Sequence, residues 1–136
     1  MIVRSLAELL GSDRVISATG WTSRRLLLRD DGMGFSLHDT EIDAGAELEM
    51  HYRNHLEAVY IIEGTGRIKD LDSGDEFPLS PGTVYALDNH DRHILIAETK
   101  LRAVCVFNPP LVGPESHDGD GAYPLLASTT SDSPSG

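Results

Sequence analysis

Short β-prone runs separated by turn residues dominate the chain. Breaks that contain glycine, such as DDGMG, DAGA, EGTG, DSGD and SPG, divide these runs. Many short strands with regular turns are typical of a sandwich or a barrel, so an all-β fold is expected. The sequence predicts strands over residues 24–28, 34–42, 48–52, 57–62, 66–71, 83–87, 93–98 and 101–107.

One short helix is expected near the amino terminus, where Ser5 to Glu8 has the Ser-x-x-Glu form of a capping box. The length of 136 residues fits one domain with one core, and this domain is predicted to span residues 1–125. The chain ends in the low-complexity stretch STTSDSPSG. Residues 126–136 are therefore predicted to be a disordered tail.

Composition narrows the classes of function. Eleven basic residues against 22 acidic ones give a formal net charge of −11, and no Lys/Arg cluster is present, so binding to nucleic acid is not expected. The one cysteine cannot form an internal disulfide. No run has the length of a membrane span or the pattern of a signal peptide, which predicts a cytoplasmic protein without a membrane partner.

Ionisable residues stand directly before an apolar run in the stretch HYRNHLEAVYIIEG. Alternation in a strand places His55 and Glu57 on one face, at the point where the strand enters the core. Charged groups are costly there unless they are paired or bind a metal. The later stretch YALDNHDRH offers Tyr85 and His93, and a carboxylate, a phenol and an imidazole together suit a first-row transition metal.

The spacing around these residues has a recognisable form. Residues 45–64 read G-x5-H-x-R-x3-E-x6-G, which resembles the first cupin motif with Arg53 where a second histidine usually stands. Residues 74–89 read G-x5-S-P-G-x2-Y-x3-N, which resembles the second cupin motif with Tyr85 in place of histidine. The resemblance implies a single-domain cupin β-barrel, or jelly roll.

Longer stretches resemble one cupin family. RLLLRDDGMGFS, NHLEAVYIIEG, PGTVYALD and VCVFNPPLVG are similar to ectoine synthases, and the similarity runs from MIVRSL to GAYPLL. The resemblance implies a hydro-lyase that closes N-γ-acetyl-L-2,4-diaminobutyrate to the compatible solute ectoine, with loss of water. It also implies a homodimer and a ferrous iron, Fe(2+), held by Glu57, Tyr85 and His93.

The same resemblance implies a substrate pocket. Arg25 suits the substrate carboxylate because its guanidinium is a planar fork, and Trp21 can form a wall. Tyr52, His55, Glu115 and His117 are the expected catalytic residues, with Glu115 and His117 as proton carriers whose acid and base roles stay open. The expected substrate-binding residues are Trp21, Arg25, Thr40, Tyr52, His55, Cys105, Phe107, Glu115 and His117.

Other interpretations are compatible with the residues alone. Glu57 could be a structural acid paired with Arg53, Tyr85 a core tyrosine, and His51 a metal ligand in place of His93. A cupin dioxygenase using His51, Glu57 and His93, or a non-catalytic cupin that binds a small molecule, are the alternative functions.

Three further expectations concern residues outside the metal set. His38 and His90 are expected at the surface or in turns. Cys105 is expected to be a small apolar wall residue, since nothing in the sequence indicates an activating partner. Residues 112–123 are rich in Gly, Pro and Asp, and we expect them to be mobile without substrate and to order over the barrel mouth when it binds.

Overall fold

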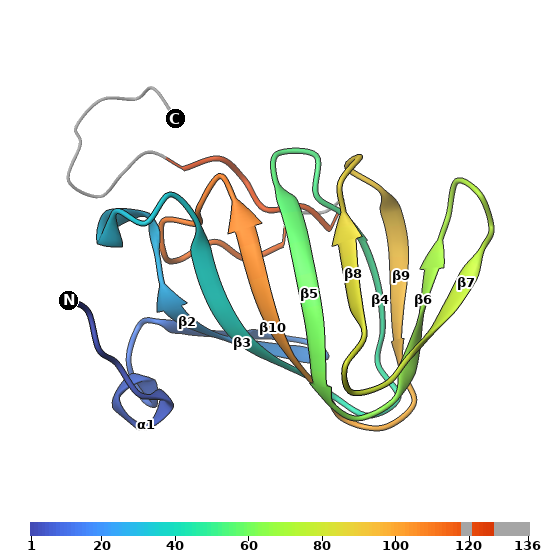
Figure 1. Cartoon of the computed structure of the whole chain (residues 1–136), viewed down its shortest axis with the longest axis horizontal. Coiled ribbons are helices and arrows are strands. Elements are labelled where there is room, and N and C mark those ends of the chain that lie inside the picture. The colour runs from blue at the N-terminus through green and yellow to red at the C-terminus, as the bar shows by residue number, and fades with distance from the viewer. Residues whose placement is uncertain (118–120, 127–136) are drawn as a thin grey trace.

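The computed structural model describes residues 1–117 and 121–126. Two antiparallel sheets face each other and curve around a common interior (Figure 1). The larger sheet has the strand order β1-β2-β3-β10-β5-β8, and the smaller sheet has the order β4-β9-β6-β7. The strands are β1 (Val15–Ala18), β2 (Trp21–Leu27), β3 (Ser36–Ile42), β4 (Glu47–His51), β5 (Leu56–Glu63), β6 (Gly66–Asp70), β7 (Glu76–Leu79), β8 (Val84–Leu87), β9 (Arg92–Ala97) and β10 (Leu101–Asn108).

The predicted amino-terminal helix is confirmed as α1 (Leu6–Leu9). The Ser5 side chain accepts a hydrogen bond from the backbone of Glu8, and the Glu8 side chain accepts one from the backbone of Ser5, which completes a capping box. A 3₁₀ turn, η1 (Arg29–Asp31), follows β2. Neither of these described helices is long and apolar enough to cross a membrane.

All eight predicted strands are present, and the all-β barrel is confirmed. Two strands were missed. β1 is only four residues long, and β7 contains Pro78, which cannot donate a ladder hydrogen bond. Both lie at sheet edges, where one unpaired side tolerates short strands and proline, and so their sequence signal is weak.

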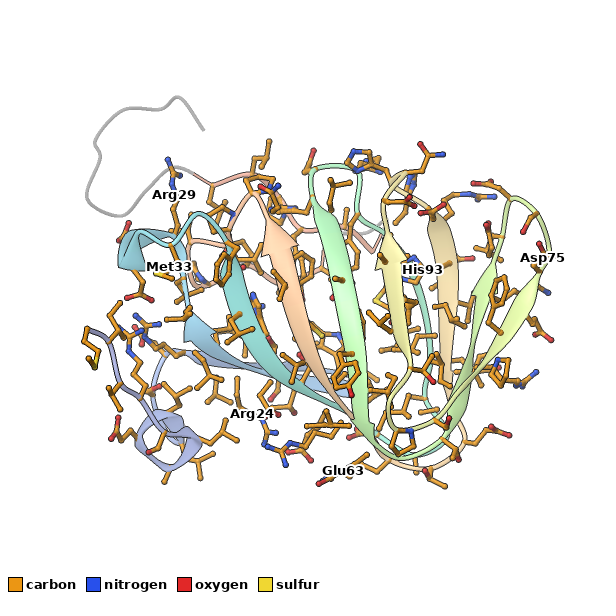
Figure 2. All side chains as sticks on the ribbon, in the orientation of Figure 1. Arg24, Arg29, Met33, Glu63, Asp75 and His93 are labelled. Carbon is orange, nitrogen blue, oxygen red and sulfur yellow. The ribbon has the colours of Figure 1, made fainter. Side chains whose placement is uncertain are left out.

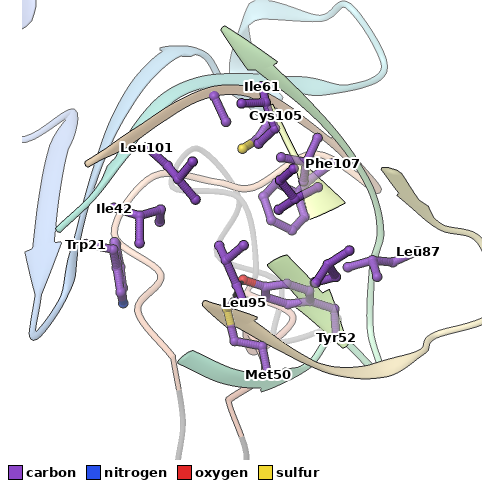
Figure 3. Close-up of a cluster of buried hydrophobic side chains, with 14 of the residues drawn as sticks. Trp21, Ile42, Met50, Tyr52, Ile61, Leu87, Leu95, Leu101, Cys105 and Phe107 are labelled. Atoms are coloured by element: carbon purple, nitrogen blue, oxygen red, sulfur yellow. Dashed lines mark hydrogen bonds between the residues drawn. The ribbon is translucent and has the colours of Figure 1, made fainter. Parts of the chain in front are cut away.

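The core lies between the two sheets. Alternate side chains of β10, from Leu101 to Phe107, are buried because successive residues of a strand point to opposite faces. Met50 and Leu95 approach them from the smaller sheet (Figure 3). The cluster therefore joins both sheets, and the cavity described below opens within it.

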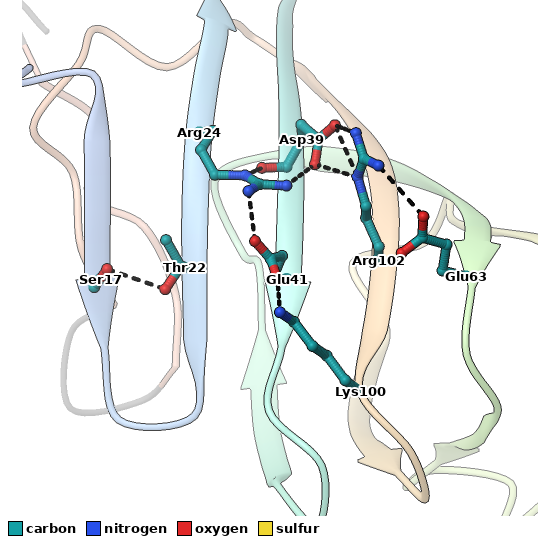
Figure 4. Close-up of polar contacts among 8 residues, drawn as sticks. All are labelled: Ser17, Thr22, Arg24, Asp39, Glu41, Glu63, Lys100 and Arg102. Atoms are coloured by element: carbon teal, nitrogen blue, oxygen red, sulfur yellow. Dashed lines mark hydrogen bonds and ion pairs between the residues drawn. The ribbon is translucent and has the colours of Figure 1, made fainter. Parts of the chain in front are cut away.

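The outer face of the larger sheet carries ion pairs. Asp39 on β3 lies between Arg24 on β2 and Arg102 on β10, with an Arg102 Nη2 to Asp39 Oδ2 distance of 2.7 Å (Figure 4). Glu41 bridges Arg24 and Lys100 in the same network. These charged groups share a face that points away from the core, so they hold the sheet together without entering the site.

A carboxy-terminal strap, defined here as residues 109–117 and 121–126, runs back from the end of β10 across the barrel opening (Figure 1). The Leu111 carbonyl accepts a hydrogen bond from the Arg29 backbone at 2.8 Å, and the Gly121 carbonyl accepts one from the His51 backbone at 3.2 Å. Leu111 and Tyr123 are buried. Leu126 is the only residue of the expected disordered tail that the structure describes, because residues 127–136 lie outside the described part.

Candidate active site

A central cavity with a volume of about 40 Å³ lies between the sheets under the strap. Its walls combine apolar side chains with a few polar groups, the usual make-up of a small-molecule site. Eight of the site residues expected from the sequence line it: Trp21, Thr40, Tyr52, Glu57, Tyr85, Cys105, Phe107 and His117.

Glu57 and Tyr85 come from neighbouring strands. Val59 on β5 is the partner of Tyr85 on β8, and Glu57 lies two residues before Val59, so both polar side chains face the cavity. Burial raises the pKa of Glu57 to about 8, and a hydrogen bond with the Cys105 thiol offsets part of that rise. Burial, with the nearby Glu57, also holds the pKa of Tyr85 well above its usual value.

His93 lies on β9 in the smaller sheet (Figure 2). Its side chain is 1% exposed. Its Nδ1 lies 2.9 Å from the Asp91 carbonyl oxygen, and its buried Nε2 has no hydrogen-bond partner in the described residues. Burial lowers the pKa of His93 and favours the neutral ring. Nδ1–H then donates to Asp91 and leaves the Nε2 lone pair free, an arrangement typical of a metal-ligating histidine. His93 and Tyr85 line a smaller cavity together, and Tyr85 also lines the central one.

These three residues fit a divalent first-row metal. They offer a carboxylate, a phenol and an unpartnered imidazole nitrogen. Burial disfavours the charged form of Glu57, and no positive group in the described residues is among the causes that shift its pKa, so a bound cation would stabilise its carboxylate. In residues 1–117 and 121–126, no three His, Cys, Asp or Glu side chains gather closely enough to hold a metal.

His51 does not join this set. Leu48 and Met50 of β4 point into the cavity, so alternation turns His51 to the other face of the strand. The His51, Glu57 and His93 arrangement considered for a dioxygenase is therefore not assembled.

Tyr52 and His117 form a polar contact at the cavity wall. The Tyr52 hydroxyl lies 2.8 Å from His117 Nε2, and the His117 ring centroid lies 5.0 Å from that of Trp21. Burial holds the pKa of Tyr52 well above its usual value, so it remains a phenol. The strap thus brings His117 to a side chain that follows β4, although the two are distant in sequence.

Arg25, His55 and Glu115 are buried beside the cavity, and Arg25 shares the inward face of β2 with the lining residues Trp21 and Ser23. Arg25 Nη1 donates to the Gly113 carbonyl at 2.6 Å and lies 3.9 Å from Glu115 Oε1. The Glu115 carboxylate accepts from the backbone of Val112 at 2.6 Å and of Gly113 at 2.7 Å. These residues therefore hold the strap against β2.

His55 precedes β5, and it lines a second cavity with Glu115 and Arg29. Its ring contacts Phe107 edge-on with centroids 5.8 Å apart, and burial lowers its pKa. The buried Nδ1 of His55 has no hydrogen-bond partner among the described residues. Glu57 and His55, which were expected on one strand face, therefore line two different cavities.

The expectation for His38 was wrong. His38 is 1% exposed, because it faces inward from β3, and it bonds to Ser23 and Ser36. Its place in the alternation of β3 would have indicated burial. His90 lies in an exposed turn, as expected, with its Nδ1 at 2.8 Å from the Tyr52 carbonyl oxygen.

Tyr123 is a site residue that sequence reasoning missed. Its ring lines the central cavity, stacks on Tyr52 at 5.2 Å and lies 4.6 Å from the ring of His117. The Arg25 guanidinium sits 5.5 Å from its centroid. No periodic pattern surrounds Tyr123, so the signal available from the residues was an aromatic side chain in the stretch GAYPLL, which follows a polar and Gly-rich segment.

Two facing antiparallel sheets around a polar site define the cupin class. A solved RmlC-like cupin from Shewanella frigidimarina shares the fold, with a TM-score of 0.59 and 20% identity over 70% of this chain and 82% of that one. The crystal structure of ectoine synthase from P. lautus gives a TM-score of 0.84 and 54% identity, covering 97% of this chain and 95% of that one.

The family model for ectoine synthase matches residues 1–127. The L-ectoine synthase of Desulfatibacillum aliphaticivorans is 59% identical over 93% of this chain and 98% of that protein. The L-ectoine synthase of Sphingopyxis alaskensis is 56% identical over 91% of this chain and 90% of that protein. The chain belongs to the ectoine synthase family, which confirms both the family and the hydro-lyase class expected from the sequence.

Proposed function

We propose that this enzyme closes N-γ-acetyl-L-2,4-diaminobutyrate to ectoine with loss of water, and that it uses Fe(2+). The observation that carries the proposal is the convergence of eight expected site residues on one cavity. Similarity to proteins named L-ectoine synthase over more than nine-tenths of the chain supports the same reaction.

The reaction needs an amine, a carbonyl and two proton transfers. The neutral α-amine forms a bond to the acetyl carbonyl carbon, and the carbonyl oxygen leaves as water with both amine hydrogens. The product is a cyclic amidine. The amide carbonyl is a poor electrophile, so the site must fold the substrate, stabilise charge on the oxygen and move protons.

The cavity walls serve the folding of the substrate. Trp21 and Phe107 present rings across an otherwise apolar space, which suits the methylene and acetyl groups. An enclosed apolar space also keeps bulk water away from the ring-closing atoms. Holding the amine against the carbonyl supplies the proximity that an extended substrate in water lacks.

The hydrogen-bonded pair of Tyr52 and His117 is the best placed to move protons. Both line the cavity, whereas Glu115 is engaged by two backbone amides behind the wall. We assign the base role to the His117 imidazole and the acid role to the Tyr52 phenol, which burial keeps protonated. Glu115 then supports the strap that carries His117.

Glu57, Tyr85 and His93 are the residues that would hold the iron, since their donor atoms and the free His93 Nε2 fit it. When bound, Fe(2+) supplies a Lewis acid that polarises the amide carbonyl. The orientation of His93 by the Asp91 carbonyl keeps the Nε2 lone pair ready for that role.

A homodimer is part of the proposal. β8 is an edge strand of the larger sheet, and Val84 on it is 61% exposed beside Tyr60, its partner on β5. Such an apolar edge suits pairing with a second copy. Sedimentation of the purified protein tests it, and a monomer at micromolar concentration would contradict it. The cytoplasmic location stays a prediction.

Product analysis tests the reaction. The purified enzyme is supplied with ferrous iron and N-γ-acetyl-L-2,4-diaminobutyrate, and ectoine is followed by proton NMR. We expect stoichiometric ectoine without oxygen uptake. Oxygen consumption would favour the dioxygenase, and substrate binding without turnover would favour the non-catalytic alternative.

A further inference from the structure

A chain of four hydrogen bonds runs through buried residues at the wall of the central cavity, which Ser23 lines. Arg25 Nε donates to Ser23 Oγ at 3.2 Å, and Ser23 Oγ lies 3.1 Å from His38 Nδ1. His38 Nε2 lies 2.8 Å from Ser36 Oγ, which accepts from the Leu111 backbone at 3.0 Å. All five residues are at most 3% exposed, so water does not compete for these bonds.

The two ends of this chain belong to different parts of the molecule. Arg25 lies on β2, and Leu111 begins the buried part of the strap. Arg25 also reaches the strap directly through the Gly113 carbonyl and the Glu115 carboxylate. The chain and these contacts form a closed loop around the turn that carries Glu115.

Arg25 has little freedom left within this loop. Its Nε and Nη1 are bonded, while the buried Nη2 has no hydrogen-bond partner in the part of the chain that the structure describes. An unpartnered buried guanidinium nitrogen is costly unless a ligand meets it. The direction in which Nη2 points is therefore set by what holds the other two nitrogens and by the Tyr123 side chain, which contacts the guanidinium.

His38 can join the serines in two ways. With its proton on Nδ1, it would donate to Ser23, and with its proton on Nε2, it would donate to Ser36. Lone-pair counting permits either tautomer. The positive charge of Arg25 lies on the Ser23 side of the ring, so it favours a lone pair rather than a proton at Nδ1. Arg25 also polarises the Ser23 hydroxyl, which then donates its proton to Nδ1. Burial and Arg25 lower the pKa of His38, which keeps the ring neutral.

We propose that His38, neutral and with its proton on Nε2, is a positioning residue that fixes the direction of the chain from Arg25 to Leu111. The Nδ1 side of the ring orients Arg25 through Ser23. The Nε2 side holds the Leu111 backbone of the strap through Ser36. The proposal rests on the proposed function only where it takes Arg25 to meet the substrate carboxylate.

The tautomer is measured directly on the intact enzyme. Two-bond ¹H–¹⁵N correlation spectra of uniformly ¹⁵N-labelled protein distinguish the two neutral forms, and the His38→Gln variant identifies the signals of His38 among the six histidines. We expect a protonated Nε2 and a bare Nδ1. A protonated Nδ1, or a charged ring at neutral pH, would overturn the proposal.

Two variants separate the halves of the ring. The carboxamide of His38→Asn stands where Nδ1 stands and keeps the Ser23 end, whereas that of His38→Gln stands where Nε2 stands and keeps the Ser36 end. We expect His38→Gln to raise KM by about tenfold with kcat changed less than about threefold, as one weakened charge-assisted hydrogen bond would. The Leu111 amide should remain protected from hydrogen exchange.

His38→Asn should show the reverse, with KM near that of the wild type and a Leu111 amide that exchanges faster. Ser17→Ala removes an exposed serine bond at the outer edge of the sheet and serves as the control without change in either readout. Identical behaviour of the Asn and Gln variants in both readouts would contradict the proposal. An unchanged KM in Arg25→Ala would instead contradict the carboxylate role of Arg25, and the tautomer and exchange measurements would still decide on His38.

Discussion

The Tyr52 hydroxyl lies 2.8 Å from His117 Nε2, and this contact joins the end of the smaller sheet to the strap. The Met50 thioether, 3.2 Å from the same hydroxyl, is a weak acceptor, so the phenol proton is better placed on His117. Two protons must move in the reaction. Of the four expected catalytic residues, all of which the structure describes, Tyr52 and His117 are the two that line the central cavity.

Tyr52→Phe should therefore lower kcat by about a hundredfold, as loss of one general acid does, while KM and bound metal stay near normal. Steady-state kinetics and metal analysis measure this. The matched control is Tyr60→Phe, which removes an exposed hydroxyl on the outer face of the larger sheet. Equal activity of both variants would remove Tyr52 from the proton transfer.

Removal of a metal-binding side chain should lower the amount of bound metal while the protein still folds. We expect Glu57→Ala, Tyr85→Phe and His93→Ala each to lose most bound iron after dialysis, because each takes away one donor of a three-donor site. His51→Ala should retain its iron, since His51 points away from the cavity. Loss of iron in His51→Ala, with iron retained in Tyr85→Phe, would contradict this site. It would favour the alternative ligand set that contains His51.

Period-two alternation was enough to predict the sheets and most cavity walls. Cys105 and Phe107 on β10 share the buried face, as their spacing requires, and Glu57 enters the same interior from β5. Alternation tells which face a side chain occupies. It does not tell which contacts that face will make, and so the hydrogen bond of Arg25 to Gly113 and its approach to Glu115 in the strap were not predicted.

The strap was less predictable for a different reason. Its residues have neither a strand nor a helix period, so their burial depends on contacts with distant parts of the chain. Glu115 looks like a solvated loop residue in the sequence, yet it is only 3% exposed. Its carboxylate accepts hydrogen bonds from two backbone amides and lies near Arg25. Tyr123 was missed for the same reason.

Acid should weaken the amino-terminal contacts through Asp31. The guanidinium of Arg4 binds both carboxylate oxygens, at 2.8 and 2.9 Å, and lowers the pKa of Asp31 from its usual value to about 2. Because the folded pKa lies below the unfolded one, the stabilisation is present above the unfolded value of about 4 and is lost as pH falls through about 2.

Asp31→Asn should accordingly lower the free energy of unfolding by about 2 kcal/mol at neutral pH and by almost nothing near the folded pKa. Urea unfolding of wild type and variant across acidic pH measures the difference. Asp13→Asn, at an exposed turn position, is the control. A difference that stays constant with pH would show that the Asp31 charge is not responsible.

Gly121 should be intolerant of a side chain. Its φ is +74°, and a Cβ there would lie 2.6 Å from the Glu49 carbonyl oxygen. Gly32 has a similar φ of +76° with open space around it, so Gly32→Ala carries the backbone strain of about 1 kcal/mol without the clash. We expect Gly121→Ala to displace the strap and to lower activity far more than Gly32→Ala. Similar activity in both variants would show that the strap adapts.

The ring of Tyr123 should matter more than its hydroxyl. The ring packs against Tyr52, Phe107 and His117, with centroids between 4.6 and 5.3 Å apart, and lies under the Arg25 guanidinium. Each aromatic pair is worth about 0.5–1.5 kcal/mol beyond burial, and a desolvated cation–π contact about 2 kcal/mol. Tyr123→Phe keeps all of these contacts, and Tyr123→Leu loses them.

We therefore expect Tyr123→Phe to keep activity within about threefold of the wild type and Tyr123→Leu to lose at least about thirtyfold, chiefly in kcat, because His117 loses the ring that holds it beside Tyr52. Iron content should stay normal in both variants, since Tyr123 is not one of the three expected ligands. Kinetics and metal analysis on the same preparations separate the effects. Loss of activity in Tyr123→Phe would instead assign a direct role to the hydroxyl, and full activity in Tyr123→Leu would show that His117 is positioned without the strap's aromatic contact.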